Sequence, residues 1–162
     1  LTTATGIRDT LGYVIVLVTL FLFLYILIGG GLNGDEKKRV GLIMLLFVGA
    51  AIFWAGFEQA ATTLTLFAND LTDRYFLGFE IPAGSLQTAN PVFIIIFAPL
   101  IGALWVRLAA RQLNPSTPLK FAFGLILMAL GFFVMAKAAE IATPDNKVGM
   151  YWLVLTYFLH SI

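Results

Sequence analysis

The chain is 162 residues long, and 60% of them are apolar while 12% are charged, with a mean hydropathy of +0.93. Soluble domains carry about 25% charged residues, so this composition excludes a soluble fold. The net charge of +1 offers no basic surface for nucleic acid. The absence of cysteine rules out disulfides, thiolate metal sites and thiol nucleophiles.

Five long apolar runs separate short charged clusters. They cover residues 10–32, 40–69, 81–106, 121–136 and 148–162. A membrane-spanning helix needs about 20 apolar residues, so the first three runs qualify directly. The fourth gains length from Leu119 and from Lys120, whose ammonium can reach the interface. The fifth is predicted to be a truncated span. Backbone groups in lipid must be satisfied within helices or closed barrels, and runs of this length predict an all-α transmembrane fold of about five helices.

The basic residues predict the orientation of these helices. Six lie in the connections before the second run and between the third and fourth, and three lie in the opposite connections. The first group consists of Lys37, Lys38, Arg39, Arg107, Arg111 and Lys120. Because positive charge is enriched on the cytoplasmic side of membrane proteins, these connections are predicted to face the cytoplasm.

Glu58 is the candidate of greatest interest, because it interrupts the second run with a carboxylate. It lies 18 residues after Val40, or roughly 27 Å along a helix, well inside the bilayer. Ionisable residues at such depth usually face a bundle interior or a water cavity and mark ion or substrate pathways. Protonation relieves the cost of burying the charge, which suits a proton carrier. A structural hydrogen bond or salt bridge between helices is the alternative.

Two further residues are candidate ligand contacts. Trp54 lies four residues before Glu58, so both project from one helical face, and Thr62 continues this stripe. Asn90 offers a donor and an acceptor beside Pro91, which is predicted to kink the third helix. Gln87 lies one turn before Asn90 on a similar face and is a lesser candidate. Ordinary packing is the favoured explanation of Trp54 when it is taken alone, and bends such as the one at Pro91 are also common in static membrane proteins.

The remaining polar residues indicate structural roles. His160 in the fifth run is predicted to make a helix-packing hydrogen bond, with a proton relay as the lesser alternative. Lys137 and Glu140 are three residues apart, as in a solvated surface pair. The sequence contains no nucleophile–base arrangement, phosphate-binding loop or metal-ligand spacing. We therefore expect no enzyme activity, no metal site and no cofactor.

Four stretches in order resemble consecutive helices of the proton-coupled oligopeptide transporter (POT) family. Residues 53–59 and 66–68 resemble its seventh transmembrane helix, and residues 81–91 and 98–100 its eighth. Residues 115–121 and 124–125 resemble the entry to the ninth helix, and residues 152–153 and 156–160 the start of the tenth. The resemblance covers about 130 residues, and four linked matches are more specific than any one of them.

The resemblance implies a fold, an activity and site residues. The family belongs to the major facilitator superfamily and couples di- and tripeptide uptake to protons at the plasma (inner) membrane. Its seventh-helix glutamate falls on Glu58, implicated in proton coupling and in an outer-gate salt bridge with a first-helix arginine. Its pocket-wall tryptophan falls on Trp54, and the eighth-helix asparagine that binds peptide falls on Asn90. Protons would be the coupling ion.

The domain organisation follows from the same resemblance. Residues 1–33 are predicted to be an accessory helix between the two bundles, and residues 34–162 the first part of the C-terminal six-helix bundle, covering helices 7–10. The partners would be peptides, protons, the lipid bilayer and the N-terminal bundle of the same transporter. The alternatives are a facilitator for another small solute and a structural helical membrane protein.

Overall fold

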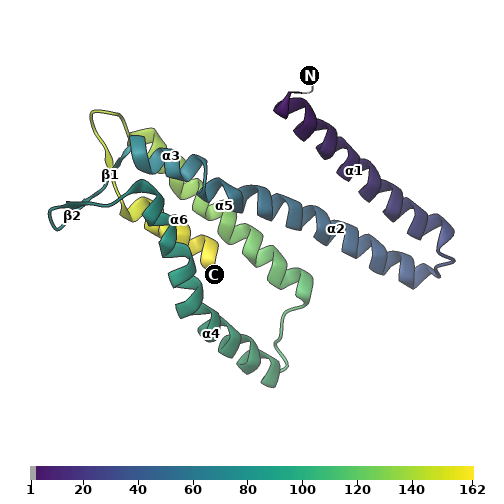
Figure 1. Cartoon of the computed structure of the whole chain (residues 1–162). Coiled ribbons are helices and arrows are strands. Elements are labelled where there is room, and N and C mark those ends of the chain that lie inside the picture. The colour runs from purple at the N-terminus through teal and green to yellow at the C-terminus, as the bar shows by residue number, and fades with distance from the viewer. Residues whose placement is uncertain (1–2) are drawn as a thin grey trace. The chain divides into compact units, whose positions relative to one another are not determined.

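The computed structural model describes residues 3–162, and most of them lie in helices (Figure 1). The α-helices are α1 (Ala4–Gly29), α2 (Gly34–Phe57), α3 (Thr63–Asp70), α4 (Ala89–Ala110), α5 (Thr117–Ile141) and α6 (Tyr151–Ser161). There are also two 3-10 helices. The first, η1 (Glu58–Ala60), directly follows α2, and the second, η2 (Ala83–Thr88), directly precedes α4. Four stretches, 4–29, 34–70, 83–110 and 117–141, are long and apolar enough to cross a membrane. These four spans and α6, which lies in the fifth apolar run, confirm the predicted all-α transmembrane fold.

The chain forms two compact units, the first ending at Val48 and the second covering Gly49–Ile162. The first unit contains α1 and the beginning of α2. Between them Gly31 adopts φ +60°, and the Asn33 side chain accepts hydrogen bonds from the backbone N–H groups of Asp35 and Glu36. Glu36 in turn accepts from the Asn33 backbone N–H, which completes a capping box. No residue of α1 is buried, as a lipid-facing helix requires. That residues 1–33 form an accessory helix remains a prediction.

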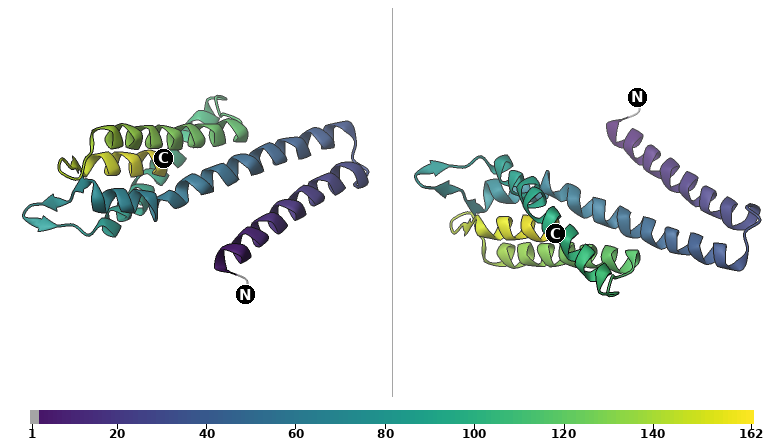
Figure 2. Two further views of the ribbon diagram at one scale, coloured as in Figure 1. Left: turned by 90° about the horizontal axis from the view of Figure 1, so that it is seen from above. Right: turned by 90° about the horizontal axis from the view of Figure 1, so that it is seen from below.

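In the second unit α6 packs on both α4 and α5 (Figure 2). On the α4 side the Phe158 ring meets Phe93 and Phe97 edge to face, with centroids 5.5 and 5.2 Å away. On the α5 side, polar side chains of α6 donate to backbone carbonyls. His160 Nε2 donates to the Met128 carbonyl at 3.2 Å, so its predicted helix-packing hydrogen bond is confirmed.

A buried apolar core holds α3, η2, α5 and α6 together. Its members are Leu64, Ala68, Leu86, Met135, Leu153 and Tyr157. These residues come from four separate elements, so the core fixes the short helices α3 and η2 against the longer helices. It thereby positions the polar residues that lie beside it.

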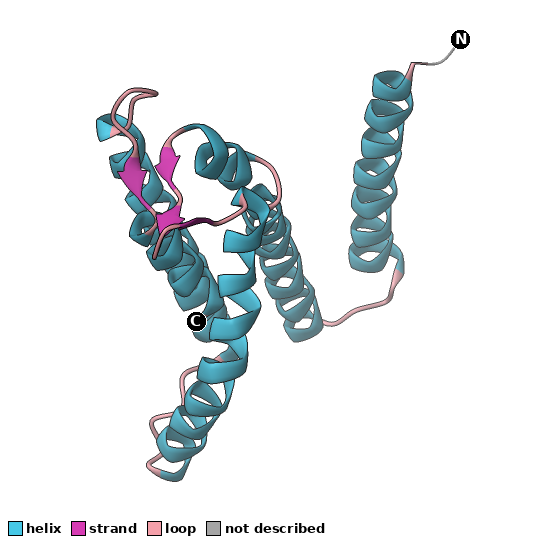
Figure 3. Cartoon of the chain, turned by 60° about the vertical axis from the view of Figure 1, so that its left-hand side comes forward, coloured by secondary structure: helices cyan, strands magenta, loops and turns pink. Residues whose placement is uncertain are grey.

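Short paired strands link the connections at one end of the second unit, and this end is the one predicted to face outside (Figure 3). Strand β1 (Thr72–Asp73) pairs in parallel with β4 (Val148–Gly149). Strands β2 (Tyr75–Phe76) and β3 (Phe79–Glu80) form an antiparallel hairpin. Arg74 lies before this hairpin, donates to the Ile81 carbonyl at 2.7 Å and pairs with Glu80 at 2.6 Å. The Arg74 side chain therefore holds the start of η2 in place.

The hydroxyl of Tyr157 provides a test of this core. It is buried and has no hydrogen-bond partner among residues 3–162, and a buried unpaired polar group costs about 1–3 kcal/mol. We expect Tyr157→Phe to raise the unfolding midpoint of the purified protein in detergent, by about 2–4 °C per kcal/mol recovered. Tyr151→Phe is the matched control and should leave the midpoint unchanged, because that side chain is exposed. A lower midpoint for Tyr157→Phe would mean that its hydroxyl is bonded in the folded protein.

Candidate functional site

The second membrane span is broken at the position of Glu58. A continuous helix over residues 40–69 was expected, and that expectation is wrong. The α-helix ends at Phe57, Glu58 begins the 3-10 turn η1, and Thr62 adopts φ −116° and ψ −89° before α3 starts. The candidate proton-coupling carboxylate therefore lies at a discontinuity of the backbone.

Threonine hydroxyls satisfy the backbone groups that this break releases. Thr65 Oγ1 donates to the Ala60 carbonyl at 2.9 Å, and Thr62 Oγ1 to the Glu58 carbonyl at 3.4 Å. Serine and threonine commonly serve this purpose inside membranes, where water cannot replace a lost backbone bond. Thr62 and Thr65 thus serve the backbone at the broken helix, which the sequence pattern alone does not reveal.

The third span also begins irregularly. Residues 83–88 form the 3-10 helix η2, and α4 starts at Ala89. Pro91 therefore lies in the first turn of α4, where a missing N–H costs nothing, and the predicted kink inside a continuous helix is replaced by this junction. Side chains three residues apart lie above one another in a 3-10 helix. Gly84 and Gln87 accordingly share one side of η2, and Asn90 follows three residues later in the first turn of α4.

The two irregular segments line a cavity of about 400 Å³. Its walls are Phe57, Ala60, Gly84, Gln87, Thr88, Asn90 and Pro91. Asn90, one of the predicted ligand contacts, therefore faces a cavity beside the break that contains Glu58. Apart from Gln87, which was a lesser candidate, the other wall residues were not predicted. The three-residue spacing of Gly84, Gln87 and Asn90 would have related Gly84 to the two amides had a 3-10 helix been expected.

Glu58 and Trp54 lie beside this cavity without lining it. Phe57 and Ala60, which flank Glu58 in the sequence, form its wall, while Glu58 itself is exposed. Its carboxylate forms no ion pair with any residue from 3 to 162. The Trp54 ring is also exposed and meets Phe57 edge to face at 5.6 Å. Trp54 thus packs on Phe57, a residue of the cavity wall, and the predicted roles of Trp54, Asn90 and Glu58 remain predictions.

Hydrogen bonds hold the two amide side chains of the cavity in place. Asn90 Nδ2 donates to Ser161 Oγ on α6 at 2.9 Å. Gln87 Nε2 donates to Thr65 Oγ1 on α3 at 2.6 Å. Neither hydroxyl partner was predicted. Ser161 lies 71 positions from Asn90 and Thr65 lies 22 positions from Gln87, and no local sequence pattern relates residues so far apart.

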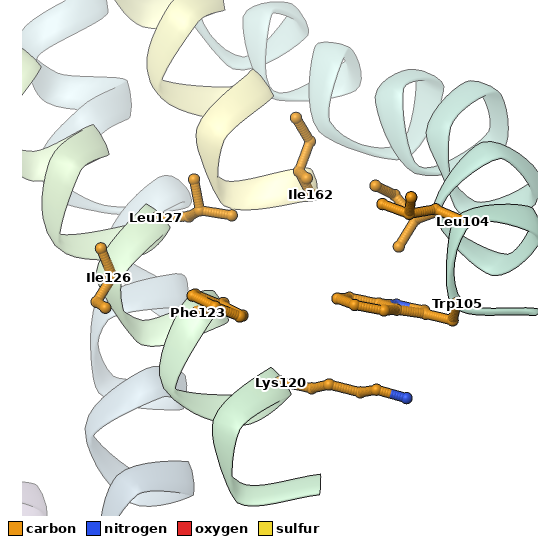
Figure 4. A pocket seen from close by; sticks show the side chains of 9 residues that line it. Leu104, Trp105, Lys120, Phe123, Ile126, Leu127 and Ile162 are labelled. Carbon is orange, nitrogen blue, oxygen red and sulfur yellow. The ribbon is translucent and has the colours of Figure 1, made fainter. Parts of the chain in front are cut away.

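A second cavity, of about 350 Å³, lies between α4 and α5 and is almost wholly apolar (Figure 4). Its charged group is Lys120, whose Nζ lies 4.8 Å from the centroid of the Trp105 ring. Such a cation–π contact suits a lysine at the predicted cytoplasmic end of a span. None of the candidate residues Trp54, Glu58 and Asn90 lines this cavity.

The chemistry of the first cavity suits binding of a polar organic molecule. Its wall combines an aromatic ring, Phe57, with two amides, Gln87 and Asn90. A few placed polar groups in a mainly apolar cavity are typical of small-molecule sites. Within residues 3–162 no cluster of His, Asp or Glu could hold a metal ion.

Sequence comparison identifies relatives over almost the whole chain. The peptide transporter YePEPT of Yersinia enterocolitica subsp. palearctica is 37% identical over 158 residues, which is 96% of this chain and 31% of that protein. The dipeptide and tripeptide permease A of Erwinia pyrifoliae is 33% identical over 131 residues, or 81% of this chain and 26% of that protein. The chain therefore spans about a third or less of the length of these relatives.

Structure comparison agrees. The chain is similar to the crystal structure of a peptide transporter POT in complex with sulfate, with a TM-score of 0.88 and 31% sequence identity. That similarity covers 98% of this chain and 32% of the other. The family model described as the POT family matches residues 15–162. A match of this extent, supported by relatives and fold, shows that the chain is a multi-pass membrane protein segment that belongs to the POT family of transporters.

Proposed function

We propose that this chain is part of a symporter that carries di- and tripeptides with protons across the plasma membrane by alternating access. The observation that carries the proposal is its membership of the POT family, whose similar members include a peptide transporter and a dipeptide and tripeptide permease. The cavity beside Glu58 supports it, because the wall offers amide groups suited to the polar backbone of a short peptide.

Each predicted site residue has a role in this mechanism. Asn90 binds the peptide within the cavity, and Trp54 supports the Phe57 wall of the same cavity. Glu58 carries the proton, and its ionised form pairs with a cation from the N-terminal bundle, which the family resemblance implies is a first-helix arginine. Protonation removes the carboxylate charge, weakens this pair and allows the two bundles to rock around a midplane site.

The decisive experiment is uptake of labelled dialanine into proteoliposomes that contain the full-length transporter. An inward proton gradient should drive accumulation, and a protonophore should abolish it. Retention of accumulation above the external concentration in the presence of the protonophore would contradict proton coupling. Absence of dialanine uptake and of competition by any di- or tripeptide would contradict the peptide assignment and favour a facilitator for another solute.

A further inference from the structure

Two amide–hydroxyl pairs of the same design lie at the wall of the cavity beside Glu58. In one, Asn90 Nδ2 of α4 donates to Ser161 Oγ of α6. In the other, Gln87 Nε2 of η2 donates to Thr65 Oγ1 of α3. Each amide lines the cavity, and each hydroxyl comes from a different neighbouring helix.

The hydroxyl protons determine which way the amides face. A serine or threonine hydroxyl has one proton to donate. Ser161 Oγ shares its proton between two backbone carbonyls, that of Tyr157 at 2.6 Å and that of Asn90 itself at 3.2 Å. Thr65 Oγ1 directs its proton to the Ala60 carbonyl at 2.9 Å. Both oxygens are therefore left as acceptors toward the amides, and an acceptor selects the NH₂ end of a carboxamide.

This arrangement leaves the two amide oxygens available to a ligand. Asn90 Oδ1 and Gln87 Oε1 accept no hydrogen bond from residues 3–162. Neither is among the enclosed polar atoms without a partner, which within these residues are Trp152 Nε1 and the Tyr157 hydroxyl. Both oxygens therefore keep accessible surface, and both belong to residues that line the cavity.

We propose that Ser161 and Thr65 are positioning residues that hold Asn90 and Gln87 with their amide oxygens available to the ligand. The cavity thereby selects a ligand group that donates hydrogen bonds, such as an ammonium or an amide N–H. This inference rests on the proposed peptide transport and adds to it the residues that determine the polarity of the site. Without the hydroxyl acceptor, the carboxamide can flip by about 180° and present its NH₂ group to the ligand. Two hydrogen-bond donors then face each other, and binding of a ligand that donates is weakened.

The test compares the affinity of the full-length transporter for dialanine with its affinity for the des-amino analogue, which lacks the ammonium. Ser161→Ala should weaken dialanine binding by about fivefold, the effect of losing one hydrogen bond, and leave binding of the analogue unchanged. Ser161→Thr retains the hydroxyl and should restore the preference for dialanine. In an Asn90→Ala background, Ser161→Ala should have no further effect, because the residue acts through Asn90. Thr65→Val should act on Gln87 in the same way.

Thr156→Ala is the matched control. Thr156 is also a hydroxyl residue of α6 that donates to its own helix and contacts a neighbouring one, but it does not line the cavity. The Thr156→Ala substitution should lower the unfolding midpoint and change the affinities for dialanine and for the des-amino analogue by the same factor. Equal weakening of both ligands by Ser161→Ala, or additive effects of Ser161→Ala and Asn90→Ala, would overturn the inference. If the unsubstituted transporter binds neither ligand, the proposed function is overturned together with the inference. Measuring the unsubstituted transporter first therefore separates failure of the proposed function from failure of the inference alone.

Discussion

Glu58→Gln should abolish proton-driven accumulation of peptide by the full-length transporter. Glutamine has nearly the shape of glutamate but can neither ionise nor carry a proton. For each coupled proton, a gradient of one pH unit can sustain about tenfold accumulation, and this ratio should fall to one in the variant. Exchange of external for internal dialanine should persist, because it requires the peptide site and not the proton. Uptake and counterflow assays on the same proteoliposomes separate the two activities.

Glu140→Gln is the control for this substitution. Glu140 is also a glutamate near a helix end, but its carboxylate is exposed and pairs with the exposed Lys137 at 2.9 Å. An exposed pair of this kind contributes little to stability and should play no part in coupling. If Glu58→Gln retained the full accumulation ratio, the coupling proton would have to be carried by a group other than Glu58.

Gly131→Ala should destabilise the protein strongly for a change of one methyl group. A Cβ at Gly131 would collide with the imidazole of His160, which packs over this glycine from α6 and donates to the Met128 carbonyl. Overpacking of a fitted contact costs about 1–3 kcal/mol, and displacement of the ring would also break its buried hydrogen bond. We expect a lower unfolding midpoint and weaker expression of the full-length protein.

Gly124→Ala provides the comparison on the same helix. A Cβ at Gly124 would meet no atom within 4 Å, and alanine is a better helix former than glycine by up to about 1 kcal/mol. This variant should match or exceed the stability of the unsubstituted protein. Adding His160→Ala to Gly131→Ala should cost less than the sum of the single changes, because the clash is then removed. Strict additivity would show that the close approach of Gly131 and His160 is not the cause.

Hydropathy and charge pattern were sufficient to predict the membrane helices. Runs of apolar residues long enough to cross a bilayer have few alternatives, because lipid offers no partner for the backbone. The pair of Lys137 and Glu140 was also predicted correctly, because its geometry follows from the spacing of two residues along one helix. The helix-packing role of His160 was predicted as well, although its partner, the Met128 carbonyl, was not.

Family resemblance and the cost of burying charge in lipid identified the residues to examine. Glu58 and Asn90 were selected in this way, and they lie respectively at a helix break and in a cavity wall beside it. The sequence could not show that Trp54 packs on Phe57 of the cavity wall without lining the cavity itself. Nor could it show which of the polar residues after Glu58 serve the backbone.

The sequence by itself therefore determined the class of protein, its membrane spans and the polar residues within them, because local hydropathy and spacing control these features. The tertiary structure decided where those spans break and which polar groups meet. The second span becomes irregular at Glu58 and the third begins with the 3-10 helix η2, and both are held by the core formed with α5 and α6. The pairing of Asn90 with Ser161 joins residues 71 positions apart. Such a contact depends on how α4 and α6 pack, and no periodicity within either helix encodes it.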